Sequence, residues 1–186
     1  MNHHLFHGQL VRLVAANSET DAELFVRWAS DSEYMRLQSS WPTRLWSQKQ
    51  AKEALRDWME HEKPDTLEFM IRTLAEDRPI GSIGLDGIRW QHGDTFVGIG
   101  IGERGYWGKG YGTDAMRIIL RYAFVELNLH RISLDVFEYN PRAIRSYEKC
   151  GFVLEGRTRD AARYDGQYCD EVCMGILRNE WEQRNA

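Results

Sequence analysis

Apolar and polar residues follow two different periods along the chain, and these periods predict the order of its elements. Apolar residues that recur every three to four positions predict helices, whereas alternating apolar and polar residues predict half-buried strands. We expect strands and helices, in chain order, at residues 9–15 (strand), 21–29 and 47–62 (helices), 67–75, 79–90 and 95–102 (strands), 112–127 (helix), 132–137 (strand), 141–150 (helix) and two strands within 160–181.

Short polar connectors decide how these elements are joined. Residues 76–78 and 91–94 separate three consecutive strands, which is typical of antiparallel hairpins. The later strand, helix, strand unit has to cross over to a parallel neighbour. The sequence therefore predicts one α+β domain over residues 1–186, with a mixed central sheet of about seven strands flanked by helices. Residues 1–8 are expected to be a flexible tail.

The strand at residues 96–102 has an unusual composition. Its apolar residues occupy one face and its glycines the other, because successive side chains in a strand take opposite sides. Glycine weakens a strand, so a bare face indicates that a helix or a ligand lies almost against it. Both alternatives remain open for the residues of this strand: Val97, Ile99 and Ile101 on one face, and Gly98, Gly100 and Gly102 on the other.

A glycine-rich loop then leads into the helix predicted at 112–127. Gly108, Gly110 and Gly112 allow backbone N–H groups to converge at the positive end of the helix, which suits a phosphate. A Walker loop would need glycine in place of Glu103 and serine or threonine in place of Gly110, so that motif is excluded. Gly110, Gly112 and Ala115 also match the dinucleotide-binding pattern G-x-G-x-x-A. That pattern should begin at the end of the strand, whereas a seven-residue loop intervenes here, so the match is weak.

The loop resembles the pyrophosphate motif of the GNAT superfamily of acyl-CoA-dependent N-acetyltransferases, [QR]-x-x-G-x-[GA]. Both required glycines are present in the stretch 107–112, whereas Trp107 replaces glutamine or arginine. With tryptophan at this position the loop resembles that of the RimJ/RimL-like branch, which is named for ribosomal-protein N-terminal acetyltransferases. In that branch the loop often reads W-G-K-G-Y. The closing stretch 160–181, with its Asp165-Gly166 turn, resembles the last hairpin of that branch. The resemblance covers roughly residues 9–182.

A second informative stretch covers residues 140–152. Asn140 suits a helix N-cap, Pro141 the first helical position and Gly151 the position after the last turn, so a short helix is closed at both ends. The stretch also resembles the GNAT segment N-x-x-A-x-x-x-Y-x-x-x-G-F. That resemblance implies that Asn140 meets the pantetheine arm and that Tyr147 reaches the thioester sulfur, although Tyr147 would also serve as ordinary packing.

The resemblance implies acetyl-CoA as the co-substrate and a set of residues that bind it. Lys109, Arg142, Arg145 and Lys149 would form a basic rim for its phosphates, or else a solvated helix face. The expected acetyl-CoA-binding residues are Ile99, Gly100, Ile101, Trp107, Gly108, Lys109, Gly110, Tyr111, Gly112, Thr113, Asn140, Arg145 and Tyr147.

The reaction needs an acid, a base and an oxyanion site. A phenol, with a pKa of about 10, stays protonated at neutral pH, so Tyr147 can donate to the departing thiolate. Backbone N–H groups near Ile101 could hold the carbonyl oxygen. Glu68, Asp86, Glu103 and Glu138 are possible bases, with surface carboxylates as the alternative for each. We rank Glu103 and Glu138 first because they are closest in sequence to the two motifs. Cys150 is expected to be a core residue.

The acceptor amine is less well specified. Trp41 and Trp46 either plug the edge of the core or line an acceptor pocket. A peptide N-terminus is slightly favoured over a polyamine or an aminoglycoside, because the acidic surplus is small and two aromatic residues suit a partly apolar ligand. A non-catalytic acyl-CoA-binding protein and a nucleotide-binding domain are the rival functions.

Composition narrows the cellular context. The 28 acidic and 24 basic residues give a net charge of −4, which argues against nucleic-acid binding. We find no membrane-spanning apolar run and no signal peptide at the start of the chain. The three scattered cysteines and three histidines near the N-terminus form no metal motif. We therefore expect a metal-free, cytoplasmic monomer or homodimer.

Overall fold

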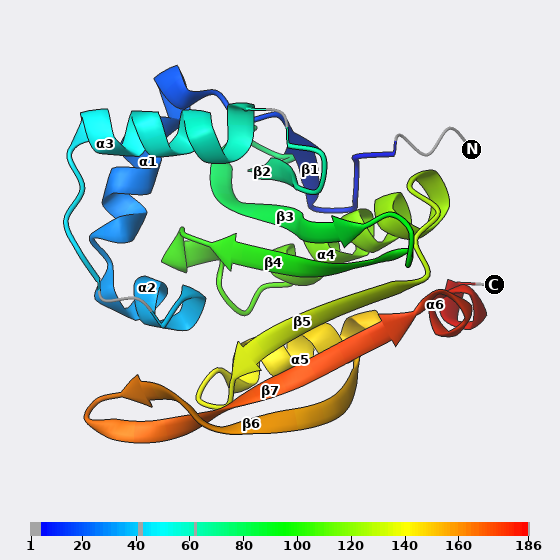
Figure 1. Ribbon diagram of the computed structural model, residues 1–186. Coiled ribbons are helices and arrows are strands. Elements are labelled where there is room, and N and C mark those ends of the chain that lie inside the picture. Colours follow the sequence, from blue (N-terminus) through cyan, green and yellow to red (C-terminus); the bar gives the residue numbers. More distant parts are fainter. Residues whose placement is uncertain (1–4, 41–42, 62, 186) are drawn as a thin grey trace.

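A computed structural model describes residues 5–40, 43–61 and 63–185. These residues form a seven-stranded sheet with the strand order β1-β2-β3-β4-β5-β7-β6 (Figure 1). The strands are β1 (Val11–Val14), β2 (Leu67–Thr73), β3 (Pro79–Arg89), β4 (Asp94–Ile101), β5 (Arg131–Phe137), β6 (Val153–Tyr164) and β7 (Gln167–Leu177). The helices are α1 (Ser18–Ala29), α2 (Ser32–Gln38), α3 (Gln48–Leu55), α4 (Tyr111–Arg121), α5 (Pro141–Cys150) and α6 (Arg178–Asn185), with π-helical turns η1 (Arg56–Glu60) and η3 (Tyr122–Glu126) and the 3-10 turn η2 (Arg104–Tyr106).

The sheet has one parallel pairing within the described ranges, between β4 and β5. That pairing covers three residue pairs, from Asp94 opposite Arg131 to Phe96 opposite Ser133. Beyond Phe96 the two strands separate, and Figure 1 shows them diverging toward their C-terminal ends. The predicted mixed α+β sheet is confirmed, and its middle contains a V-shaped gap.

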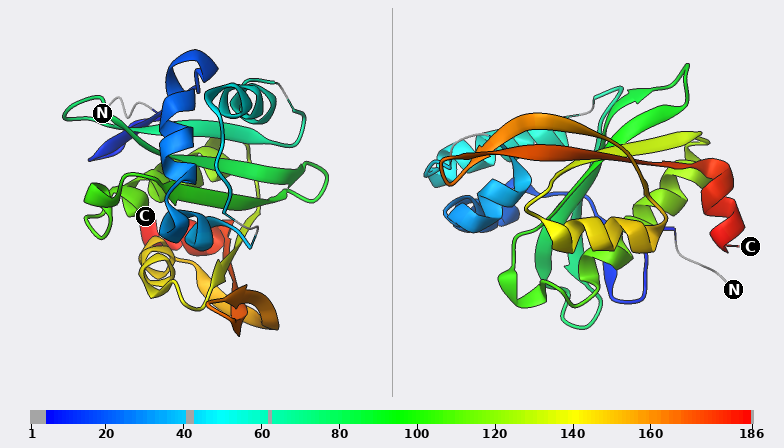
Figure 2. Two further views of the ribbon diagram at one scale, coloured as in Figure 1. Left: turned by 90° about the vertical axis from the view of Figure 1, so that its left-hand side faces the viewer. Right: turned by 90° about the horizontal axis from the view of Figure 1, so that it is seen from below.

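Helices cover both faces of the sheet. Gly102, directly after β4, lies against Trp28 of α1, and Gly100 of β4 lies against Tyr34 and Gln38 of α2. On the opposite face, Ile99 and Ile101 approach Gly112 of α4. The largest cluster of buried apolar residues lies between the sheet and α4 with η3, and Figure 2 shows α4 and α5 on the opposite side from α1 to α3. We call the face under α1, α2 and α3 the glycine face.

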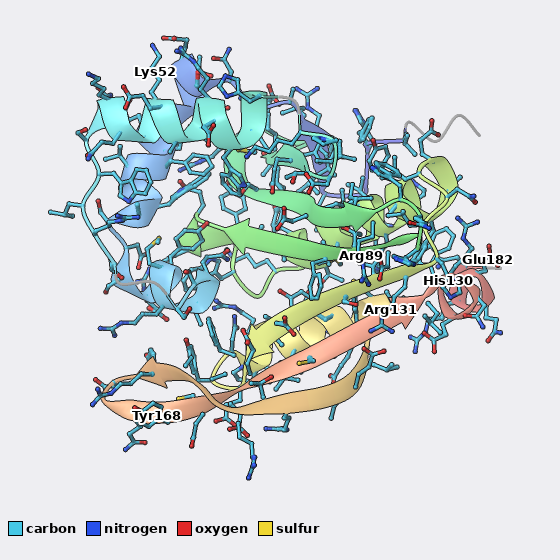
Figure 3. The ribbon with its side chains drawn as sticks, in the orientation of Figure 1. Lys52, Arg89, His130, Arg131, Tyr168 and Glu182 are labelled. Carbon is cyan, nitrogen blue, oxygen red and sulfur yellow. The ribbon has the colours of Figure 1, made fainter. Side chains whose placement is uncertain are left out.

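Local residues start and end several elements, as the sequence predicts for Asn140 and for the Asp165-Gly166 turn. Ser47 and Gln50 form a capping box at α3, and the Asn140 side chain accepts a hydrogen bond from Ala143 N at the start of α5. Asp165 and Gly166 both have left-handed backbone angles, with φ of 50° and 81°, as a tight hairpin turn requires. The resulting β6–β7 hairpin runs from the end near His130 and Glu182 to Tyr168 at its tip (Figure 3).

The N-terminal segment differs from the expected tail. Phe6 packs against Phe69 and Tyr122, with ring centroids 5.5 and 5.1 Å apart. The buried carboxylate of Asp114 in α4 accepts hydrogen bonds from the backbone N–H groups of the next segment: Gln9, Leu10 and Val11. These contacts hold residues 6–11 against β2, η3 and α4, and residues 1–4 lie outside the described part. No helix in that part is both long enough and apolar enough to cross a membrane.

Candidate active site

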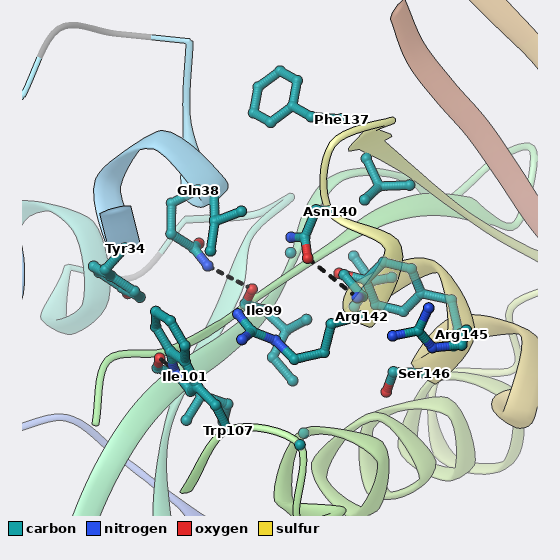
Figure 4. A pocket seen from close by; sticks show the side chains of 18 of the residues that line it. Tyr34, Gln38, Ile99, Ile101, Trp107, Phe137, Asn140, Arg142, Arg145 and Ser146 are labelled. Atoms are coloured by element: carbon teal, nitrogen blue, oxygen red, sulfur yellow. Dashed lines mark hydrogen bonds between the residues drawn. The ribbon is translucent and has the colours of Figure 1, made fainter. Parts of the chain in front are cut away.

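A pocket of about 350 Å³ occupies the gap between β4 and β5. Its walls come from β4 and the glycine loop, from β5, and from α2 and α5. Because the strands part here, the pocket reaches both faces of the sheet, the one under α4 and α5 and the glycine face. Figure 4 shows side chains from these elements pointing toward one another across it.

The glycine loop and the start of α4 form one wall. Gly108 and Gly110 have φ values of 71° and 91°, which other residues rarely adopt. Gly110 is the N-cap of α4, and no described side chain caps it, so N–H groups of the first turn lack a side-chain acceptor. Both glycines line the pocket together with Gly112. This wall fits an anionic phosphate, as the sequence predicts.

Trp107 fastens the loop to β4. Its indole N–H donates a 2.6 Å hydrogen bond to the carbonyl of Ile101. The Arg142 guanidinium lies 4.1 Å from the centre of the Trp107 ring, and the Arg104 guanidinium lies 5.3 Å from it. Burial lowers the pKa of Arg142, which lines the pocket with Arg145 and Lys149 (Figure 4). The phosphate end of the pocket is therefore basic although the whole chain is acidic.

Four of the expected acetyl-CoA-binding residues do not line the pocket. Gly100 faces α2, since a Cβ atom at Gly100 would be 2.6 Å from the Tyr34 hydroxyl. Tyr111 packs edge-on against Tyr106, and the Thr113 hydroxyl lies 2.7 Å from that of Ser146 in α5. Lys109 is exposed in the loop. The pocket lining does include the remaining nine: Ile99, Ile101, Trp107, Gly108, Gly110, Gly112, Asn140, Arg145 and Tyr147.

The glycines along β4 and directly after it have two different kinds of surroundings. Helices α1 and α2 pack directly on Gly102 and Gly100, so close helix packing explains these two residues. Gly98 is different, because no atom of the described residues lies within 4 Å of the position a Cβ would take. Gly98 also lines the pocket, so a ligand can approach its backbone there.

Helix α5 presents Asn140 and Tyr147 to the pocket. The Asn140 side-chain oxygen accepts from Ala143 N at 3.2 Å, which leaves its amide N–H₂ for another partner. Tyr147 is half-buried and packs edge-on against Phe152, and burial raises the pKa of its phenol to about 12. The phenol therefore stays protonated at neutral pH. Cys150 is a core residue as predicted, and burial raises the pKa of its thiol to about 11.

Helix α2, which the sequence reasoning missed, forms the opposite wall. The Gln38 side-chain amide donates to the carbonyl of Ile99 at 3.0 Å, as Figure 4 shows. The Tyr139 hydroxyl donates to the carbonyl of Arg36 at 2.8 Å, while its ring stacks on Phe137 and Tyr164. These contacts join α2, the end of β5 and the closing hairpin into a single wall. The sequence feature that could have predicted α2 is Asp31, a favourable N-cap residue. Its side chain accepts hydrogen bonds from the backbone N–H groups of Glu33 and Tyr34.

The two carboxylates ranked first as the base lie outside the pocket. Burial alone would raise the pKa of Glu103, but Trp28 and Arg27 donate hydrogen bonds to it and hold the pKa below its usual value. Glu138 accepts from Asp170 N at 3.0 Å and pairs with Arg157. Closeness in sequence to the motifs therefore did not bring either carboxylate to the reaction pocket.

Two other carboxylates line the pocket on the glycine face. They are Asp135 of β5 and Glu171 of β7. Burial, followed by the charge of Asp135, raises the pKa of Glu171. Sequence reasoning missed both residues, because only the pairing of β5 with β7 brings them together. The pocket is thus basic at one end and acidic at the other.

Trp46 belongs to a neighbouring cavity. Trp46 packs against the buried cluster that contains Ala51 and Leu55, and the Arg44 guanidinium lies over its ring. Trp46 therefore does contribute to the edge of the core. It also lines a cavity of about 510 Å³ that shares Tyr34 and Gln38 with the first pocket. Trp41 lies outside the described residues.

A split mixed sheet, a glycine cradle at a helix N-terminus and a protonated tyrosine on the next helix define a class of acyl-CoA-dependent transferases. Residues 11–153 match the family model described as an acetyltransferase (GNAT) domain. The chain therefore belongs to the GNAT acetyltransferase family.

Several relatives with curated descriptions support this assignment. The probable N-acetyltransferase YjcK of Bacillus subtilis is 37% identical over 66% of this chain and 67% of its own length. A spermidine N(1)-acetyltransferase of Vibrio cholerae is 35% identical over 60% of this chain and 64% of its own. The putative ribosomal N-acetyltransferase YdaF of Bacillus subtilis is 37% identical over 43% of this chain and 47% of its own.

Solved structures agree with the fold and the co-substrate. The spermidine N-acetyltransferase from Vibrio cholerae in complex with CoA and spermine matches with a TM-score of 0.81 and 26% identity, covering 92% of this chain and 98% of that one. The chain is an N-acetyltransferase that uses acetyl-CoA, which confirms the enzymatic prediction. The uncapped first turn of α4 and the basic side chains beside it fit the phosphates of that co-substrate.

Proposed function

We propose that this enzyme transfers an acetyl group from acetyl-CoA to a primary amine by direct attack within the pocket between β4 and β5. One observation carries the proposal. The gap opens the sheet from face to face, so a thioester from the basic side and an amine from the acidic side can meet beside Tyr147. No covalent enzyme intermediate is needed for this transfer.

The basic side would hold the co-substrate. The uncapped first turn of α4 and Arg142 both border the phosphate end, so the backbone N–H groups of that turn and the guanidinium would bind the phosphates. Arg145 and Lys149 add positive charge there, and the free amide N–H₂ of Asn140 suits the pantetheine arm. Trp107 would act indirectly, by holding the loop and the Arg142 guanidinium in place.

The gap edge of β4 would bind the acetyl oxygen. The carbonyls of Ile99 and Ile101 already accept hydrogen bonds from Gln38 and Trp107, which both line the pocket. In an antiparallel strand the N–H and C=O of one residue point to the same side. The N–H groups of these two residues therefore face the gap as well, where they can stabilise negative charge on the oxygen.

Tyr147 would act as the acid of the reaction. As the nitrogen–carbon bond forms and the carbon–sulfur bond breaks, the departing thiolate takes the phenolic proton. Burial raises the pKa of Tyr147 to about 12, which keeps that proton in place until charge develops on sulfur. The proton lost from the acceptor ammonium goes to a base.

We propose a small aliphatic polyamine as the first candidate acceptor. Asp135 and Glu171 give the acceptor end negative charge, and Phe137 and Tyr34 supply aromatic surface for the methylene groups. The spermidine acetyltransferases among the relatives support this choice.

A peptide N-terminus is the second candidate. The resemblance of residues 107–112 and of the closing hairpin to the RimJ/RimL-like branch favours it, and so does the putative ribosomal N-acetyltransferase among the relatives. The acidic end of the pocket would accept an α-ammonium group as readily as a polyamine, so charge alone does not separate the two candidates.

The test is an assay of thiol release from acetyl-CoA with spermidine, spermine, an aminoglycoside and alanyl- and seryl-peptides as acceptors. We expect the highest kcat/KM with a polyamine. Glu171→Gln should raise the KM for spermidine about tenfold or more while leaving acetyl-CoA affinity unchanged, with the exposed Glu53→Gln as the matched control. Turnover confined to peptides would favour the second candidate, and no turnover with any amine would refute the proposed function.

A further inference from the structure

Glu68 of β2 is a carboxylate that the steps above do not use. In the sheet it is paired with Gly84 of β3, and Gly84 is in turn paired with Gly98 of β4. A Cβ atom at Gly84 would lie 2.1 Å from the nearer Glu68 carboxylate oxygen, so the carboxylate rests directly on the glycine backbone. Any larger residue at this position of β3 would displace the carboxylate.

Glu68 does not itself line the reaction pocket, but Gly84, on which its carboxylate rests, is paired with Gly98, which does. Gly98 lines that pocket and is open on the glycine face, and its Cα lies about 5 Å from that of Gly84, as in any antiparallel pair. The next residue of β4, Ile99, turns its backbone toward the gap. An amine above Gly98 would therefore lie between the carboxylate and the bond that must form.

Groups from three directions face this carboxylate. The Trp58 indole of η1 donates a hydrogen bond to it, Lys63 lies in the segment before β2, and Asp86 lies two residues further along β3. Asp86 is exposed and accepts a 3.0 Å hydrogen bond from Thr66. Burial and then the Asp86 charge raise the pKa of Glu68 to about 8, whereas Trp58 and Lys63 oppose the rise. A base with a pKa close to the working pH is the most effective kind.

Building on the proposed function, we propose that Glu68 is the general base of this enzyme. The acceptor ammonium, seated over Gly98, gives a proton to the Glu68 carboxylate directly or through one water molecule. The neutral amine then attacks the thioester carbonyl carbon, the carbon–sulfur bond breaks, and Tyr147 protonates the thiolate. The attacking nitrogen loses its second proton as the amide forms, and this proton restores the Tyr147 phenol. Glu68 afterwards releases its proton to solvent, so each turnover releases one proton overall.

The test is the pH dependence of kcat/KM for spermidine between pH 6 and 10. The wild-type value should rise with pH and level off above a break near 8, because only the ionised carboxylate accepts a proton. Glu68→Gln keeps the shape of the side chain, so it should lower kcat/KM at least 100-fold and abolish the break. Acetyl-CoA affinity, measured by calorimetry, should not change.

Two further variants separate a catalytic role from a structural one. Asp86→Asn removes a neighbouring negative charge from the surface, so the break should move to lower pH while the protein stays folded. Glu53→Gln, on the exposed face of α3, should leave the profile unchanged.

The outcomes distinguish this proposal from the one it rests on. If Glu68→Gln retains kcat/KM within about threefold, or if the break stays at the same pH in Asp86→Asn, Glu68 is not the base although the enzyme acetylates amines. If the wild-type enzyme acetylates no amine, the proposed function itself fails.

Discussion

The immediate surroundings of each side chain, rather than its type, decide its chemistry in this enzyme. Glu68 and Glu103 are both glutamates beside central strands, yet their pKa values shift in opposite directions. Two donors, Trp28 and Arg27, favour the ionised form of Glu103. Burial and a second carboxylate disfavour the ionised form of Glu68. The sequence shows which residues carry carboxylates, but these partners come from distant parts of the chain.

Tyr147 gives a prediction at the same scale. Phenylalanine keeps the ring and its contact with Phe152 but removes the proton, so Tyr147→Phe should lower kcat by about 10² to 10⁴. Acetyl-CoA affinity and the melting temperature should stay nearly constant, which stopped-flow kinetics, calorimetry and thermal unfolding would show. If kcat stays within about threefold when chemistry limits turnover, another group protonates the thiolate.

At the scale of elements, Gly100 of β4 and Gly102 directly after it determine how closely α2 and α1 approach the sheet. A Cβ atom at Gly102 would lie 2.2 Å from the ring of Trp28, which is only 2% exposed. Gly98, four residues earlier on the same face, has open space instead. A single run of alternating glycines thus serves helix packing at one end and ligand access at the other.

Gly98 of β4 and Gly102 directly after it therefore predict contrasting alanine variants. Gly102→Ala should destabilise the enzyme by about 1–3 kcal/mol, because the buried Trp28 ring has little room to move. Gly98→Ala should leave the free energy of unfolding within about 0.5 kcal/mol of the wild type, since its methyl group meets no neighbour. Urea unfolding of both variants measures the difference. Equal stabilities would contradict the close contact between α1 and β4.

At the scale of the whole molecule, charge is separated across the sheet. The chain carries a net charge of −4, yet Arg142, Arg145 and Lys149 gather at one end of the pocket while Asp135 and Glu171 occupy the other. Such local fields decide which ligand enters at which side, whatever the sign of the total charge.

This separation predicts how acetyl-CoA binding depends on salt and on Arg142. The dissociation constant of acetyl-CoA should rise as salt increases from 50 to 500 mM, although protein and ligand are both acidic overall. Arg142→Gln should weaken binding about tenfold and reduce the salt dependence, whereas Arg117→Gln, exposed on α4, should do neither. Calorimetry at several salt concentrations tests both. Equal affinities in the two variants would show that Arg142 does not contact the co-substrate.

The sequence by itself determined the order of the seven strands and of the helices other than α2 and α6, together with the glycine cradle, because these depend on residues a few positions apart. Ser47, Asn140 and the Asp165-Gly166 turn act through their own neighbours in the chain, and so they could be predicted. Residues 107–112 and 140–152 likewise contained enough local pattern to indicate an acetyl-CoA-dependent enzyme.

Only the tertiary structure decided where the strands part and which side chains then face the gap. The β4–β5 pairing ends after Phe96, and no local pattern marks that point. The acidic end of the pocket depends on the register of β5 with β7. The position of Glu68 depends on the registers that place Gly84 under its carboxylate and Gly98 next to Gly84. Contacts between residues far apart in the chain fix these features, so the cradle could be predicted from the sequence and the acceptor side of the site could not.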